Sequence, residues 1–281
     1  MAARKPRTDL LEEDPFANFG GRRVQHAQAR DDGQWRQQPH VRVVQVQFNP
    51  FMRGFQEQIG RAPKMHTGSF WHFSKTELKD LGISLLCFSL ALAFVFQGGL
   101  FGGMLNKMVT SFLAGTVLLT GVAAIAFGPA FIIHELAHKF VARHYNCWAE
   151  FRADPRGLRN GVILAAIIGF LFMAPGAVMV AGNVSRRQNG MIALAGPVSN
   201  LILWLLMLPV ALFVPLPGMI EMLVMLWFSA NAILGMFNML PIGPLDGRKI
   251  KSWNQGVFWL FIAIFVALVY VTMFNRALIG L

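Results

Sequence analysis

Residues 130–141 read A-F-I-I-H-E-L-A-H-K-F-V, so His134, Glu135 and His138 stand inside an apolar segment. On a helix, residues four apart lie on the same face. Two imidazoles at that spacing can therefore bind one metal ion, with the glutamate beside the remaining coordination position. An unliganded charged side chain in hydrocarbon would cost about 2.5 kcal/mol or more. The segment therefore predicts a metal site on a helix in apolar surroundings.

The composition is that of a membrane protein. Of the 281 residues, 55% are hydrophobic and 14% are charged, and the mean hydropathy is +0.49. These values exclude an ordinary soluble globular domain. We expect an all-α polytopic membrane protein with about five to six transmembrane helices. The apolar segments near spanning length are 81–96, 109–141, 161–182, 191–214, 219–240 and 257–274.

The first 80 residues are polar, so we expect no cleavable signal and an N-terminus on the cytoplasmic side. Residues 1–40 are predicted to be a disordered basic tail, and residues 41–80 a cytoplasmic juxtamembrane segment with one strand at 41–48. Ser74 and Glu77 have the spacing of a capping box that opens the first helix. The membrane domain is predicted to cover 81–274.

The net charge of +11 follows from membrane topology better than from nucleic-acid binding, because the basic residues are spread over tail and loops. With the N-terminus inside, segment 109–141 returns to the cytoplasmic side and brings His134 and His138 toward it. The loops expected inside carry Arg143, Arg152, Arg156, Arg159, Arg186, Arg187, Arg248, Lys249 and Lys251, against Lys107 and Arg276 outside.

Cys87 and Cys147 lie far apart in the sequence, so we predict structural thiols without a disulfide.

Segment 161–182 has arginines before and after it, and a single crossing cannot leave both ends on the same side. Its middle holds the turn signal Ala174-Pro175-Gly176. We therefore predict a re-entrant hairpin or a sheet-like insertion without net crossing, and a plain kinked span is the alternative. Such a hairpin could offer an edge strand to an extended peptide.

In segment 109–141, the pair Gly128-Pro129 predicts a kink.

A second polar cluster follows segment 219–240, where residues 238–247 read N-M-L-P-I-G-P-L-D-G. Pro241 and Pro244 end the helix. If segment 161–182 does not cross, Asp246 lies at the same depth and on the same side as His134. Taken alone, Asp246 is most simply a turn residue. Beside His134 and His138 it is favoured as the third ligand of a metal ion, with the fourth position left for water.

These motifs resemble the site-2 protease family of intramembrane zinc metalloproteases, peptidase family M50. The resemblance covers about residues 81–253. It rests on the H-E-L-A-H segment, on residues 238–247 as the family pattern N-x-x-P-x-x-P-x-D-G, and on A-G-P-V-S-N at 195–200. It implies a site-2 protease core with one Zn²⁺ per chain, held by His134, His138 and Asp246. It also implies that Glu135 is the general base that activates the attacking water.

The same resemblance implies a substrate, and the topology implies a location. The substrate would be a transmembrane segment of another protein, cut within or near the lipid bilayer, with the active site toward the cytoplasmic side of a cell membrane. Asn200, Asn238, Pro241 and Pro244 are candidates for substrate binding or oxyanion stabilisation. Interhelical hydrogen bonding is the alternative for the two asparagines.

Other functions are kept as alternatives. Intramembrane proteases that trim prenylated proteins use a glutamate as third ligand, but only Glu150, in a loop, and Glu221, toward the opposite face, follow the motif. A catalytically silent membrane chaperone would not need Glu135. A divalent-metal transporter should show more than one ionisable cluster along its path. No nucleic-acid partner is expected, and the sequence does not set the oligomeric state.

Overall fold

The computed structural model describes residues 70–100, 109–171, 173 and 175–281. The predicted tail, the strand at 41–48 and most of the juxtamembrane segment lie outside these residues. The described elements are α2 (Lys75–Phe96), α3 (Val109–His144), β1 (Trp148–Ala153), α4 (Pro155–Ile168), β2 (Gly176–Ala181), α5 (Arg186–Phe213), α6 (Gly218–Asn238), α7 (Asp246–Trp253), α8 (Gln255–Phe274) and the 3-10 helix η3 (Arg276–Ile279).

Five of the described helices, α2, α3, α5, α6 and α8, are long and apolar enough to cross a membrane. Their most apolar windows have mean hydropathies between 1.7 and 2.6. The prediction of an all-α polytopic membrane protein is therefore confirmed. The first described helix, α2, begins at Lys75, ahead of the predicted boundary at residue 81.

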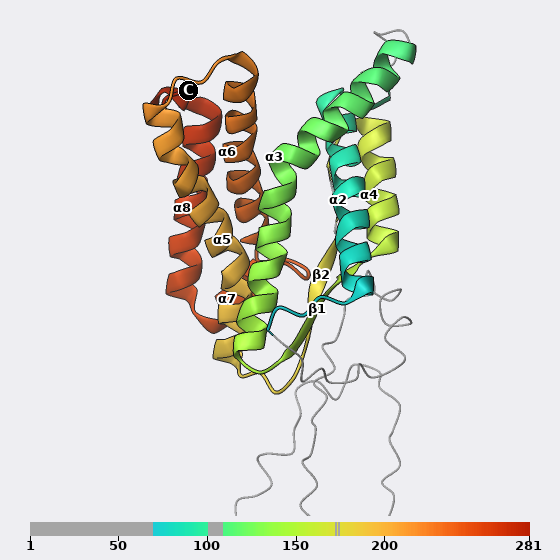
Figure 1. Cartoon of the computed structure of the whole chain (residues 1–281). Coiled ribbons are helices and arrows are strands. Elements are labelled where there is room, and N and C mark those ends of the chain that lie inside the picture. The colour runs from blue at the N-terminus through green and yellow to red at the C-terminus, as the bar shows by residue number, and fades with distance from the viewer. Residues whose placement is uncertain (1–69, 101–108, 172, 174) are drawn as a thin grey trace, which may run out of the picture. The chain divides into compact units, whose positions relative to one another are not determined.

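Helix α3 is the central element of the bundle, because it packs against α2, α5 and α6. Figure 1 shows α2 and α4 on one side of α3 and α5, α6 and α8 on the other. One core cluster joins α2, α3 and α6 through buried apolar side chains: Phe88, Leu92, Ala123, Ala126, Phe127, Ala130 and Ala230. Pro129 lies inside α3 and cannot donate a backbone hydrogen bond to the preceding turn. The helix bends along its length (Figure 1).

The segment from Asp154 to Pro175 leaves the sheet and returns to the same place. The Asp154 N–H donates to the Pro175 carbonyl oxygen at 3.2 Å, so the two ends are neighbours. Between them, α4 runs as far as Gly169, whose backbone packs against Gly98 and Gly99 just beyond the end of α2. This segment therefore returns to the end of the bundle from which it starts, as a hairpin does, and its re-entry into a membrane remains a prediction.

The predicted turn of that segment is wrong. The chain reverses at Gly169, which ends α4 in the left-handed conformation with φ of 67°. Gly176, placed in the turn by the sequence analysis, instead begins β2, and Ala174 lies outside the described residues. A glycine suits the reversal because it adopts positive φ at no steric cost.

Strands β1 and β2 form a two-stranded antiparallel sheet in which Trp148 pairs with Ala181 and Ala153 pairs with Gly176. β1 was missed in the sequence analysis, which placed Glu150 in a loop. The outer edge of β1 is bound by carboxylates of α2. Glu77 accepts the Phe151 N–H at 3.1 Å, and Asp80 accepts the Ala153 N–H at 3.3 Å.

The capping box predicted at the start of α2 is half correct. Ser74 is the N-cap and its hydroxyl oxygen accepts the Glu77 N–H at 3.1 Å. The Glu77 carboxylate does not return to the backbone of Ser74. It binds the Phe151 N–H and the ammonium group of Lys139 instead, so tertiary partners outcompete the local cap.

Candidate metal centre

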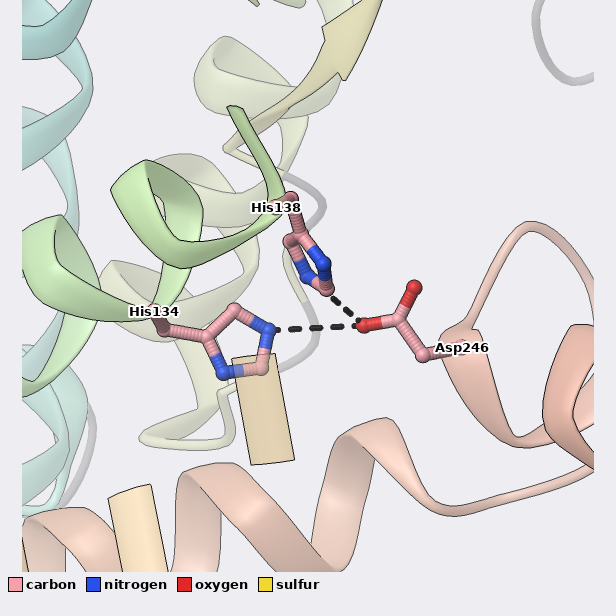
Figure 2. A group of neighbouring side chains, drawn as sticks. All are labelled: His134, His138 and Asp246. Carbon is pink, nitrogen blue, oxygen red and sulfur yellow. Dashed lines mark ion pairs between the residues drawn. The ribbon is translucent and has the colours of Figure 1, made fainter. Parts of the chain in front are cut away.

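The two histidines of α3 point at one carboxylate oxygen. Oδ2 of Asp246 lies 3.4 Å from Nε2 of His134 and 3.0 Å from Nε2 of His138 (Figure 2). All three side chains are buried, with residue exposures of 1%, 7% and 5% for His134, His138 and Asp246. Their candidate ligand atoms lie within 4.8 Å of one another.

Asp246 reaches this place because α6 ends at Asn238 and α7 begins at Asp246. Gly247 packs against the backbone of Met239 and Leu240, and a side chain there would collide with it. The second oxygen of Asp246, Oδ1, accepts a hydrogen bond from Lys249 Nζ at 3.1 Å. The turn between α6 and α7 thus leaves Oδ2 facing the histidines.

Several groups act on the pKa of the Asp246 carboxyl. Burial alone would raise it, because the charged form loses hydration. The neighbouring His138 and Lys249, with hydrogen bonds from His134 and His138, outweigh burial and hold the pKa well below its usual value. Asp246 is therefore a carboxylate, the form that binds a metal ion.

Each histidine is oriented through its other ring nitrogen. His134 Nδ1 lies 2.6 Å from Asn200 Oδ1, and His138 Nδ1 lies 2.7 Å from the Ile192 carbonyl oxygen. Both partners are oxygens that only accept hydrogen bonds, so each Nδ1 carries a hydrogen and Nε2 is the nitrogen left for a metal ion, which displaces any proton there. This is the outer-shell arrangement of metal-binding histidines.

The backbone of α5 leaves space beside the ring nitrogens at Gly196. A Cβ on Gly196 would lie 2.5 Å from Nε2 of both His134 and His138. Real Cβ atoms do not approach other atoms that closely. The absence of a side chain at this position is thus part of the site, a role that the sequence analysis did not assign to Gly196.

Glu135 lies next to the cluster on α3 and is partly exposed. Its carboxylate interacts with the charged groups of the site and with the backbone N–H of Val178 on β2. The register explains this contact. Val178 pairs with Phe151, whose N–H points outward to Glu77, so the N–H of Val178 also points away from its partner strand. One edge of β2 therefore faces Glu135.

The other predicted site residues lie as follows. Asn200 is fully buried between α3 and α6, and its hydrogen bonds are interhelical. Asn238 is half-buried and donates to the Leu234 carbonyl of its own helix at 3.1 Å. Pro241 and Pro244 are exposed in the turn before Asp246. A role of these four residues toward substrate or oxyanion remains a prediction.

Sequence reasoning missed Asn231, Ile192, Lys249 and Val178 as neighbours of the site. Asn231 had a signal, because an amide inside an apolar span is rare and needs a partner. The other three had no signal. Ile192 and Val178 contribute backbone groups, which have no sequence signature, and Lys249 was assigned to the basic loops.

The donor set fits zinc. Ligand atoms about 2.0–2.2 Å from a tetrahedral Zn²⁺ are about 3.4 Å apart, and the two nitrogen-to-oxygen separations here are 3.4 and 3.0 Å. Two neutral imidazole nitrogens with a carboxylate oxygen leave one position open, as in catalytic zinc sites. The space beside Gly196 lies next to the two nitrogens.

An H-E-x-x-H helix that meets a third, carboxylate ligand inside apolar helices defines a membrane-embedded metal centre of the metallopeptidase class. The comparisons agree. "Putative zinc metalloprotease MJ0611" of Methanocaldococcus jannaschii is 38% identical over 187 residues, 66% of this chain and 88% of that protein. This chain belongs to the same zinc metalloprotease family.

Two further relatives carry the same kind of name. "Putative zinc metalloprotease YwhC" of Bacillus subtilis is 30% identical over 43% of this chain and 63% of its own length. "Putative zinc metalloprotease sll0528" of Synechocystis is 28% identical over 48% of this chain and 32% of its own length. No protein-family model and no solved structure matches this chain significantly.

Proposed function

We propose that this protein is an intramembrane zinc metalloendopeptidase of the site-2 protease kind, peptidase family M50. It would hydrolyse peptide bonds within or near transmembrane segments of other membrane proteins. The observation that carries the proposal is the convergence of His134, His138 and Asp246 in a bundle of five apolar helices, with Glu135 beside them. The metalloprotease relatives support the chemistry.

In this proposal the chain holds one zinc ion through His134, His138 and Asp246. When bound, zinc polarises the substrate carbonyl and lowers the pKa of water. Glu135 takes the proton of the attacking water and passes it to the leaving amine. Its partial exposure is consistent with this role, because a general base must reach both water and substrate.

We place the metal centre toward the cytoplasmic side of a cell membrane. The end of α3 that carries His138, the sheet, the start of α5 and α7 all belong to the same end of the bundle (Figure 1). The basic residues of these elements gather at that end, and positive charge marks the cytoplasmic side.

The free edge of β2 is the proposed docking place for the substrate backbone. The carboxylates of Glu77 and Asp80 occupy the outer edge of β1. Among the described residues, no strand pairs with the outer edge of β2, which faces Glu135. A transmembrane helix must unwind before its peptide bonds are accessible, and an unwound segment can pair with a strand edge.

The first experiment measures bound zinc and cleavage of a single-span test protein by the detergent-purified chain. We expect about one zinc per chain, lost in His134→Ala and in Asp246→Ala together with cleavage. Glu135→Gln should keep zinc and lose cleavage by about 10²- to 10⁴-fold. Zinc that persists without Asp246 would refute the ligand set. Zinc without cleavage in the wild type would favour the chaperone or transporter.

A second experiment tests the docking edge. The N–H of Val180 points outward like that of Val178, because Val180 pairs with Ala149 two positions along the ladder. Val180→Pro removes this donor and spares the hydrogen bonds to β1. We expect zinc to stay bound and cleavage to fall, while the control Val180→Thr retains activity. Full cleavage by the proline variant would exclude strand pairing at this edge.

A further inference from the structure

A chain of buried amide groups connects α6 to the ring of His134. Asn231 and Asn200 have no exposed surface. Asn231 Nδ2 donates to the Trp227 carbonyl oxygen at 2.9 Å, and Asn231 Oδ1 accepts from Asn200 Nδ2 at 3.1 Å. Asn200 Nδ2 also donates to the Ala130 carbonyl oxygen at 3.2 Å, while Asn200 Oδ1 lies 2.6 Å from His134 Nδ1. Three helices are thus joined at one imidazole.

The direction of every hydrogen bond in this chain is determined by its ends. A backbone carbonyl oxygen can only accept. The Trp227 carbonyl therefore selects the amide nitrogen of Asn231, and the Ala130 carbonyl selects the amide nitrogen of Asn200. Both amide oxygens then face the next member of the chain. Because the amide oxygen of Asn200 also only accepts, Nδ1 of His134 must donate.

We propose that Asn231 is a positioning residue of the metal centre, which acts through Asn200 to fix the tautomer and ring orientation of His134. Asn231 contacts neither the coordinating atoms nor a substrate in this role. The inference rests on the proposed zinc site but not on the proposed substrate.

The physical reason is the cost of an unpaired amide in apolar surroundings. A buried amide group without a hydrogen-bond partner is strongly unfavourable. Without Asn231, Asn200 would retain one N–H with no acceptor. Rotation of the Asn200 side chain can relieve that cost, but it turns Oδ1 away from His134. Nε2 would then no longer be held toward Asp246.

The second histidine provides an internal comparison. His138 Nδ1 is held by the Ile192 carbonyl oxygen at 2.7 Å and has no connection to the amide chain. A change at Asn231 should therefore alter the ring of His134 and leave the ring of His138 unchanged. General damage to the bundle would alter both.

The direct test is ¹⁵N spectroscopy of the full-length, metal-free chain in detergent with labelled histidines, assigned with His134→Gln and His138→Gln. We expect a proton on Nδ1 of both rings in the wild type. Asn231→Ala should lower the proton occupancy of Nδ1 in His134 alone. An unprotonated Nδ1 on His134 in the wild type, or equal changes in both rings of Asn231→Ala, would overturn the inference.

Zinc affinity, measured by competition with a chromophoric chelator, provides a second readout. Loss of a group that hydrogen-bonds to a metal ligand typically weakens metal binding by about 10- to 100-fold. For Asn231→Ala we expect a weakening of about tenfold, because Asn231 acts through Asn200. Asn231→Asp should restore affinity, because a protonated carboxyl offers a carbonyl oxygen and an O–H donor in the same places. Wild-type affinity in Asn231→Ala would count against the proposal.

Thr272→Val is the matched control. It removes another fully buried interhelical hydrogen bond, from Trp204 Nε1 to Thr272 Oγ1 at 3.2 Å, away from the metal centre. Zinc affinity should be unchanged, and equal weakening would show that Asn231 acts only through packing. A wild type with the expected tautomers and zinc affinity but without peptide cleavage would refute the proposed function and leave this inference intact.

Discussion

The ammonium group of Lys139 lies 2.5 Å from the carboxylate of Glu77, and neither side chain has exposed surface. Lys139 follows the last histidine of the metal centre and also donates to the His72 carbonyl oxygen at 2.9 Å. Glu77 binds the Phe151 N–H of β1 at 3.1 Å. One ion pair thus joins the start of α2, the metal-binding helix and the sheet.

Breaking this ion pair should destabilise the fold strongly. Lys139→Met leaves the Glu77 charge buried without a partner, and we expect a loss of about 3–5 kcal/mol in the free energy of unfolding. Lys139→Met combined with Glu77→Gln should lose less, because glutamine still accepts the N–H of Phe151 without a charge. Equilibrium unfolding in mixed micelles measures both values.

The control for this pair is Lys75→Met, which changes an exposed lysine of α2. It should alter stability by no more than about 0.5 kcal/mol. If the single and double variants at Lys139 and Glu77 were equally stable, the buried charge would not be the cause.

Gly196→Ala should weaken metal binding without unfolding the protein. The added methyl group would lie 2.5 Å from Nε2 of both histidines, whereas alanine itself favours a helix over glycine. We expect zinc affinity to fall by about tenfold or more, measured by chelator competition. Gly121→Ala on α3 meets no atom within 4 Å and should leave affinity unchanged. Normal zinc binding by Gly196→Ala would place the metal elsewhere.

Lys249 should hold Asp246 in its ligating position. Its side chain is 43% exposed, yet its ammonium donates to Asp246 Oδ1 at 3.1 Å. Lys249→Gln should weaken zinc binding toward the tenfold expected for an outer-shell contact, and Lys249→Arg should retain most of it. Lys251→Gln is the control, because it removes an equal charge from the same helix and leaves the contact between Lys249 and Asp246 in place. Equal losses in the two glutamine variants would indicate a general effect of charge.

Glu150 should make stability depend on pH in the acid range. Burial alone would raise its pKa, but hydrogen bonds from Arg152 and Ser74 and the charge of Arg152 lower the pKa below its usual value of 4.5. A lowered pKa means that the folded state binds the proton more weakly than the unfolded state. The stabilisation is therefore complete above pH 4.5 and is lost as the pH falls through the folded value.

The measurement is the unfolding free energy of the wild type and of Glu150→Gln over that pH range. The difference between them should be constant above about pH 5 and shrink below about pH 4. A difference that does not change with pH would show that the Glu150 charge contributes nothing.

The membrane helices could be predicted because their signal is local. A long apolar segment must form its own backbone hydrogen bonds in lipid, so length and hydropathy suffice. Strand β1 gave no such signal, since Glu150 and Arg152 interrupt its apolar pattern. It is a strand because β2 pairs with one edge and the carboxylates of α2 bind the other. The reversal at Gly169 likewise depends on packing against Gly98 and Gly99.

The sequence by itself determined the helices and the shared face of His134 and His138, because the spacing of residues along a helix fixes which side chains are neighbours. Only the tertiary structure decided which distant groups meet there. The topology argument predicted that Asp246 reaches the two histidines, but the amide of Asn200 with its partner Asn231 and the space at Gly196 were found only in the structure. Their approach depends on how whole helices pack, a long-range property that no short segment of sequence encodes.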